Sequence, residues 1–113
     1  MPGVAAEEGA IDPRWQAIIA IGNFIEDHPN EVWGFAAKWG CVSDDDWRAA
    51  VATCLVEHLL EYHFDRVFPM VEELAIKDPR FAETFLSCFD YGQSEQPEYA
   101  ERLRRLRSHL RPR

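Results

Sequence analysis

Apolar residues recur along this chain every three or four positions, which is the spacing of one face of an α-helix. In the first half of the chain, Ile18, Gly22 and Ile25 form such a stripe, and Ile21 and Phe24 widen it. No stretch shows the sustained alternation of apolar and polar residues that is typical of a half-buried strand. The pattern therefore predicts an all-α protein, a compact bundle of five to six short helices.

Proline, glycine and aspartate mark where these helices begin and end. Asp12 and Pro13 are expected to open the first helix as its N-cap and first helical residue, and this helix should end before Pro29. A second helix is predicted at about residues 30–39, with Gly40 in the position of a left-handed C-terminal stop.

The strongest start signal is the acidic run from Ser43 to Asp46. Ser43 is predicted to cap the backbone amide of Asp46, and the carboxylates that follow it favour the positive end of the helix dipole. This helix should run to about His63 and form the centre of the fold, because its apolar stripe is the widest. Pro69 forbids an unbroken continuation, so we expect a bend between His63 and Phe68.

Two more helices are predicted in the last third of the chain. Asp78 and Pro79 open the first of them, and Gly92 is expected to end it. Its inward face should consist of Phe81, Thr84, Phe85, Cys88 and Phe89. The last helix, at about residues 95–110, carries a narrow apolar seam that can dock on a groove. The seam is formed by Tyr99, Leu103, Leu106 and Leu110.

Charge is distributed unevenly along the chain. There are 12 Lys and Arg against 20 Asp and Glu, a net charge of −8. Six arginines lie between Glu98 and Arg113, where the net charge is +4, so the other 97 residues carry −12. A body this acidic repels phosphate backbones, which argues against nucleic acid as a partner. The basic helix, which includes Arg104 and Arg105, is expected either to dock on its own acidic body or to meet a partner.

At 113 residues the chain has room for one domain, which we expect at residues 11–113 after a disordered segment at residues 1–10. The start of the chain lacks the basic and apolar regions of a secretory signal, and no apolar run is long enough to span a membrane. Cys41, Cys54 and Cys88 are too widely spaced to predict a disulfide framework or a metal knuckle. We therefore expect a cytoplasmic protein with no cofactor.

The cluster from Glu57 to His63 is the strongest candidate for chemistry. His58 and Glu61 are neighbours on one helical turn, and imidazole with carboxylate can bind zinc or iron when a second helix completes the site. We favour the alternative, a hydrogen-bonded core histidine, because His58 also lies on the apolar stripe. Cys41 precedes a helix start, but the aspartates after it favour the protonated thiol. No nucleophile elbow, phosphate loop or metalloprotease helix is present, so we do not expect an enzyme.

The aromatic content exceeds what a small core needs, with four tryptophans and seven phenylalanines. One interpretation is a tryptophan-rich core that seals a small domain. The other is an exposed interaction surface, because aromatic side chains often anchor protein interfaces. The residues expected on that surface are Trp33, Trp39, Trp47, Asp44, Asp45 and Asp46.

The stretch from Asp44 to Ala52 resembles the second helix of HEAT-type repeats, in which an acidic cap is followed by an apolar residue, an arginine and small residues. The predicted helix before it takes the place of the first repeat helix, so the resemblance covers about residues 29–62. It implies HEAT-like helical hairpins within the bundle and a role in scaffolding or in binding proteins or nucleic acid on a concave face. The chain has too few units for an ordinary solenoid. Arg48 is carried over only as a structural arginine that pairs with an acidic neighbour, and Asp44 lies four residues before it.

Together these features predict a small non-enzymatic helical module that binds another protein, through its aromatic and acidic surface or through its basic last helix. The alternative is an acidic inhibitor or immunity-type protein that neutralises a basic enzyme. A metal-binding protein centred on His58 and Glu61, and a nucleic-acid-binding role for the arginine tail, rank below both. The seam of the last helix also makes a homodimer a candidate assembly.

Overall fold

The computed structural model describes residues 13–111, with side chains from residue 16 onward. Within that range it contains six α-helices, a π-helical turn (η1) and a 3₁₀ turn (η2), and no strand, which confirms the predicted all-α class. The expected disordered segment at residues 1–10 and the expected Asp12 cap lie outside the described residues. In chain order the elements are α1 (Pro13–Gly22), α2 (Pro29–Trp39), α3 (Asp45–Val51), η1 (Ala52–Val56), α4 (Glu57–Lys77), α5 (Pro79–Leu86), η2 (Gly92–Glu95) and α6 (Pro97–Leu110).

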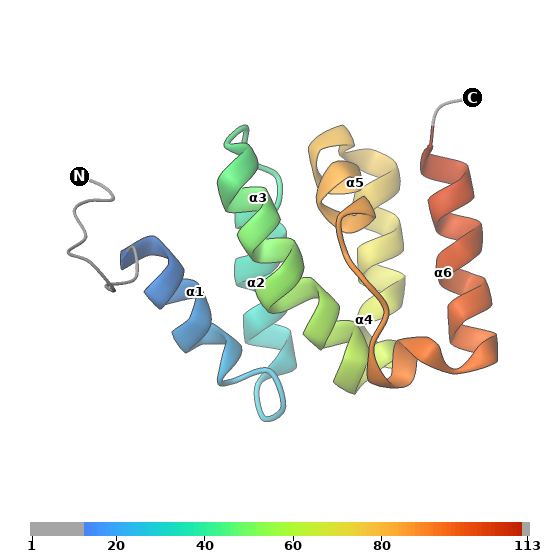
Figure 1. Cartoon of the computed structure of the whole chain (residues 1–113), viewed down its shortest axis with the longest axis horizontal. Coiled ribbons are helices and arrows are strands. Elements are labelled where there is room, and N and C mark those ends of the chain that lie inside the picture. Colours follow the sequence, from blue (N-terminus) through green and yellow to red (C-terminus); the bar gives the residue numbers. More distant parts are fainter. Residues whose placement is uncertain (1–12, 112–113) are drawn as a thin grey trace.

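The helices lie beside one another across the molecule, with α1 and α6 at its two ends (Figure 1). The elements α3 and η1 run without interruption into α4 and form the middle of the fold. Helix α2 packs against α3 and α4, and α5 and α6 pack against α4. The molecule measures 44 × 34 × 22 Å, so most helices have one face on the core and one on the surface.

The core follows the central run of helix. Its fully buried side chains include Val51, Leu55, Leu59 and Phe64, which lie on the stripe of the central helices. Leu103 and Leu106 of the predicted α6 seam are also buried in this core. These two seam residues therefore pack against the chain's own helices, while Tyr99 and Leu110 are half-buried.

The start of α3 differs from the prediction by one residue. Asp44, not Ser43, is the N-cap: its carboxylate accepts hydrogen bonds from the backbone amides of Asp46 (2.9 Å) and Trp47 (3.2 Å). Arg48 pairs with Asp45 and Glu83. The Arg48 guanidinium is buried and contacts the carboxylate of Asp45, that of Glu83 at 2.8 Å, and the carbonyl oxygen of Val42 at 2.7 Å. The predicted structural role of Arg48 is confirmed, with different partners.

Gly40 ends α2 for a reason other than the expected left-handed conformation. Its backbone is right-handed, with φ −78° and ψ −4°. A Cβ atom at this position would lie 2.7 Å from the carbonyl oxygen of Ala36 and 2.9 Å from Cδ1 of Phe81. Thr84 also donates its hydroxyl to the carbonyl oxygen of Gly40 at 2.7 Å. Glycine is required here because α5 packs directly on the end of α2.

The predicted bend before Pro69 lies at His63. His63 has non-helical backbone angles (φ −139°, ψ 49°), and the chain changes direction there, within α4. The His63 side chain donates from Nε2 to the carbonyl oxygen of Ile25 at 3.0 Å, which ties the bend to the turn after α1.

The helix after Asp78 is shorter than predicted. Asp78 caps it as expected, but α5 ends at Leu86, and the chain runs on as an irregular segment to Gly92. Phe81, Phe85 and Cys88 are buried, whereas Phe89 is 66% exposed. The prediction that Phe89 points inward was wrong because the helix ends before the residue that would have continued its inner face.

Candidate functional site

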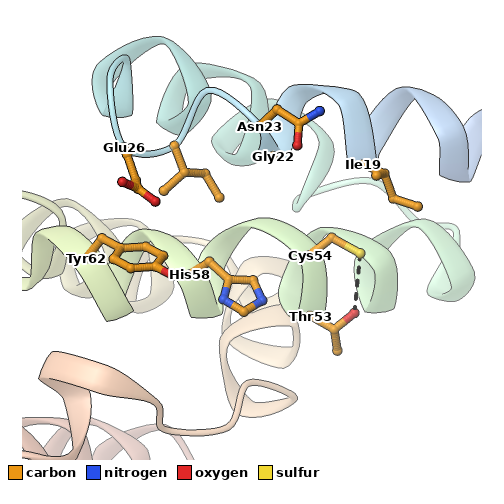
Figure 2. A pocket seen from close by; sticks show the side chains of 9 residues that line it. Ile19, Gly22, Asn23, Glu26, Thr53, Cys54, His58 and Tyr62 are labelled. Carbon is orange, nitrogen blue, oxygen red and sulfur yellow. Dashed lines mark hydrogen bonds between the residues drawn. The ribbon is translucent and has the colours of Figure 1, made fainter.

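A groove of about 440 Å³ separates α1, with the turn after it, from η1 and the first part of α4. We call it the α1–α4 groove. Figure 2 shows one wall carrying Ile19, Asn23 and Glu26 and the opposite wall carrying Cys54, His58 and Tyr62. The complete lining consists of Ile19, Gly22, Asn23, Ile25, Glu26, Thr53, Cys54, His58 and Tyr62.

The wall of the groove opposite α1 begins at the π turn. Ala52, Leu55 and Val56 of this turn are buried, while Thr53 and Cys54 are half-buried and line the groove. A π turn inserts an extra residue into a helix and is found frequently at functional sites. Two small side chains of the π turn, Thr53 and Cys54, thus lie at the groove.

A second, smaller hollow of about 290 Å³ lies between α2 and the turn that joins it to α1. We call it the α1–α2 hollow. Most of its lining atoms are carbon, and Glu31 and His28 lie at its border. Its apolar lining consists of Ile21, Phe24, Val32 and Phe35.

Three large hydrophobic side chains around these two hollows are exposed. Ile19 is 46% exposed, Phe24 53% and Tyr62 45%. Single exposed apolar residues are common, but a group of them beside hollows is typical of a binding surface. We call these three residues, with the groove and the hollow, the α1 surface.

The α1 surface is also acidic. Glu26 lines the groove, Glu31 lines the hollow, and Asp27 lies between them in the sequence. From residue 16 to residue 37 the chain contains no lysine or arginine. Cationic groups are therefore the complement of this surface.

The predicted metal candidates, His58 and Glu61, form a pair with each other. His58 Nδ1 lies 2.6 Å from Glu61 Oε1, and since a carboxylate accepts, the imidazole donates. The ring of Tyr91 stacks on His58 with centroids 6.2 Å apart. Over the described residues no group of three or more His, Cys, Asp or Glu side chains is placed to hold a metal ion. The hydrogen bond to Glu61 orients the His58 imidazole, which lines the groove.

Glu57, the first residue of the predicted chemical cluster, is a buried carboxylate whose burial the sequence did not indicate. It accepts a hydrogen bond from the backbone amide of Phe89 at 2.8 Å, which holds the segment after α5 against α4. Burial raises the pKa of Glu57, and the hydrogen bond from Phe89 opposes that rise. This contact explains how a segment with an exposed Phe89 side chain is kept in place.

The predicted tryptophan surface is divided into two parts. Trp39 and Trp47 stack on each other, with ring centroids 5.5 Å apart, and both are half-buried. Trp33 instead packs edge-on against Phe81 and lines a separate hollow of about 320 Å³ with Met70. The structure therefore brings together two of the three tryptophans and gives each a packing role.

The three aspartates of the predicted surface are exposed at the start of α3. Asp44 caps the helix and Asp45 contacts Arg48, so both have structural roles. Asp46 lies beside them in the first turn.

The arginines of α6 contact their own chain. Arg107 donates to both carboxylate oxygens of Asp90 and to the carbonyl oxygen of Cys88, and Arg102 lies over the ring of Phe68. Arg104 and Arg105 are both paired with Glu101 and remain largely exposed. The basic helix thus docks on its own body through Arg102 and Arg107.

Two cysteine thiols, those of Cys41 and Cys88, have raised pKa values. Burial and the nearby Asp78 carboxylate raise the pKa of Cys41 to about 11, and burial raises that of Cys88. Both thiols are therefore protonated at neutral pH. Cys54, the third free cysteine, is half-buried at the groove.

Comparisons with protein-family models, with curated proteins and with solved structures gave no match to this chain. In the part of the chain that the structure describes, no helix is both long and apolar enough to cross a membrane.

Proposed function

We propose that this chain is a small non-enzymatic helical module, a HEAT-like adaptor of the cytoplasm, that binds another protein through its α1 surface. The observation that carries the proposal is the grouping of Ile19, Phe24 and Tyr62, each more than two-fifths exposed, around two hollows. Aromatic and aliphatic anchors beside pockets are the usual centres of protein interfaces. This surface takes the place of the tryptophan surface, because the tryptophans are already packed against neighbouring rings.

The experiment is a pull-down from a lysate of the source organism with two matched double variants. Ile19→Glu/Phe24→Glu places two carboxylates on the α1 surface. Ile76→Glu/Phe89→Glu makes the same change at two other exposed hydrophobic positions, which are 55% and 66% exposed. We expect a protein that is retained by the wild type and by the second variant and lost from the first. Equal retention by all three, or equal loss from both variants, would contradict the proposal.

An acidic inhibitor of a basic enzyme is the second candidate. It is favoured by the exposed aspartates at the start of α3 and by the net charge of −8. In the same pull-down, Asp46→Asn removes one of these charges without changing the Asp44 cap or the Asp45 contact with Arg48. Loss of a basic protein with Asp46→Asn, but not with Ile19→Glu/Phe24→Glu, would favour the inhibitor.

A further inference from the structure

We propose that the occupant of the α1–α4 groove is a basic amphipathic helix of a partner protein. This inference rests on the proposed function, since it names the chemistry of the partner that the same surface takes. Three features of the groove carry it: the kind of walls it has, its length, and its charge.

The walls favour a helix over an extended peptide. One wall consists of α1 and the turn after it, and the other of η1 and α4 (Figure 2). The backbone groups of helical walls are already bonded within their own helices, and no strand edge exists among residues 13–111. The backbone amide and carbonyl groups of an extended peptide would lose their hydrogen bonds to water and would gain none from the walls. A helix carries its backbone hydrogen bonds internally and needs only side-chain contacts.

The length of the groove suits two to three turns of such a helix. The wall opposite α1 extends from Thr53 to Tyr62. At ~1.5 Å per residue this distance is about 14 Å, which corresponds to roughly two and a half turns. Over that length an amphipathic helix presents apolar side chains at positions i, i+4 and i+7. Ile19 on one wall and Tyr62 on the other are exposed apolar contacts for those side chains.

The charge of the site requires a cationic rim on the occupant. Glu26 lines the groove, and the exposed Asp27 follows it in the turn after α1. No lysine or arginine occurs from residue 16 to residue 37 to neutralise them. Lysine or arginine beside the apolar stripe of a docked helix would lie within reach of the Glu26 carboxylate. A second copy of this chain fits less well, because it carries a net charge of −8 and Leu103 and Leu106 of its basic helix α6 are buried in its own core.

The test uses three fluorescein-labelled synthetic peptides of about 14 residues, roughly four helical turns. The first has leucine at helical spacing and lysine elsewhere. The second has the same composition, with the leucines moved out of helical spacing. The third has glutamate in place of lysine. Binding to the full chain is measured by fluorescence anisotropy, for the wild type and for Ile19→Glu, Tyr62→Glu and the control Ile76→Glu.

We expect the first peptide to bind, and Ile19→Glu or Tyr62→Glu to weaken binding about tenfold or more, as for an interface anchor. Ile76→Glu should change the affinity by less than about twofold, since Ile76 lies outside the groove. The second peptide should bind at least about tenfold more weakly, and the third should not bind. Circular dichroism of each variant checks that the helices are intact.

Any of four results would overturn the inference. Equal binding of the first and second peptides, or equal effects of Ile19→Glu and Ile76→Glu, would mean attraction by net charge alone. Sedimentation of the unliganded chain that shows self-association lost in Ile19→Glu would identify a second copy as the occupant. If the peptides fail while the pull-down still gives a protein that depends on Ile19 and Phe24, the inference falls and the proposed function stands. If neither the peptides nor any protein in the pull-down binds through this surface, both the inference and the proposed function are refuted.

Discussion

The side-chain amide of Gln93 bonds to the backbone on both sides of the break in α4, at Phe64 and at Tyr62. Gln93 Oε1 accepts from the backbone amide of Phe64 at 2.9 Å, and Gln93 Nε2 donates to the carbonyl oxygen of Tyr62 at 3.0 Å. These two backbone groups lie on either side of His63, the one residue in the described part of α4 with non-helical angles. One side chain from η2 therefore satisfies both ends of the bend.

Replacing Gln93 should destabilise the fold at this bend. Gln93→Ala removes a donor and an acceptor from partly buried backbone groups, and we expect the free energy of unfolding to fall by about 1–3 kcal/mol. Gln93→Glu keeps an acceptor for the Phe64 amide but loses the donor to Tyr62, so its effect should have the same sign. Urea unfolding measures both, and Gln96→Ala, at an exposed position nearby, is the control. A Gln93→Ala protein as stable as the wild type would show that water replaces the amide fully.

Arg48 should matter more to stability than either of its carboxylate partners. Its side chain is 10% exposed, whereas those of Asp45 and Glu83 are 85% and 67% exposed. Arg48→Met leaves the carbonyl oxygen of Val42 without its donor and should cost roughly 1–3 kcal/mol. Glu83→Gln removes a charge that water already solvates and should cost less than about 1 kcal/mol. Thermal unfolding of the two variants checks the order, and the reverse order would contradict it.

Replacing Gly40 and Gly34 by alanine should change the stability of the protein in opposite directions. A Cβ at Gly40 would collide with the carbonyl oxygen of Ala36 and the ring of Phe81, whereas a Cβ at Gly34 meets no atom within 4 Å. Gly40→Ala should therefore destabilise the protein by about 1–3 kcal/mol through overpacking. Gly34→Ala should stabilise it by about 0.5–1 kcal/mol, because alanine is the better helix former. Melting temperatures that move in the same direction would refute this explanation of Gly40.

The elements that local signals define were predictable from the sequence. Pro79 and Pro97 each stand at the start of a helix, Asp78 caps α5, and Leu103 and Leu106 are buried as their spacing predicted. In each case the signal and its consequence lie within one or two helical turns.

Other features depend on contacts that the sequence does not display locally. The bend at His63 was expected, but its support by Gln93 joins residues about thirty positions apart. The π turn lies within an apolar run whose periodicity does not distinguish α from π hydrogen bonding. Gly40 was assigned the right place for the wrong reason, because its constraint comes from Phe81 on another helix.

The candidate site was only partly visible. Ile21 and Phe24 widen the apolar stripe predicted for the first helix, and this width was the available signal. The tryptophan surface remains a prediction, and its residues are partly occupied by packing against neighbouring rings. Whether an aromatic residue anchors the core or a partner depends on the helices that surround it.

The buried carboxylate of Glu57 should make stability depend on pH. Its pKa is raised by burial above the ordinary value of 4.5, so the folded state binds this proton more tightly than the unfolded state does. The contribution of Glu57 to stability is therefore full below pH 4.5 and is lost as the pH rises through the raised pKa. Glu57→Gln stays neutral, and its amide oxygen can still accept from the Phe89 amide.

Relative to the wild type, Glu57→Gln should therefore gain stability as the pH increases from about 4 to about 8, and the two proteins should differ least at the acidic end. Urea unfolding across this range measures the difference. Glu72→Gln removes an exposed charge from the same helix and serves as the control. The prediction would be contradicted if the difference in the free energy of unfolding between the wild type and Glu57→Gln stayed constant or widened toward low pH. Either result would mean that Glu57 remains ionised in the folded protein and is stabilised by the Phe89 amide.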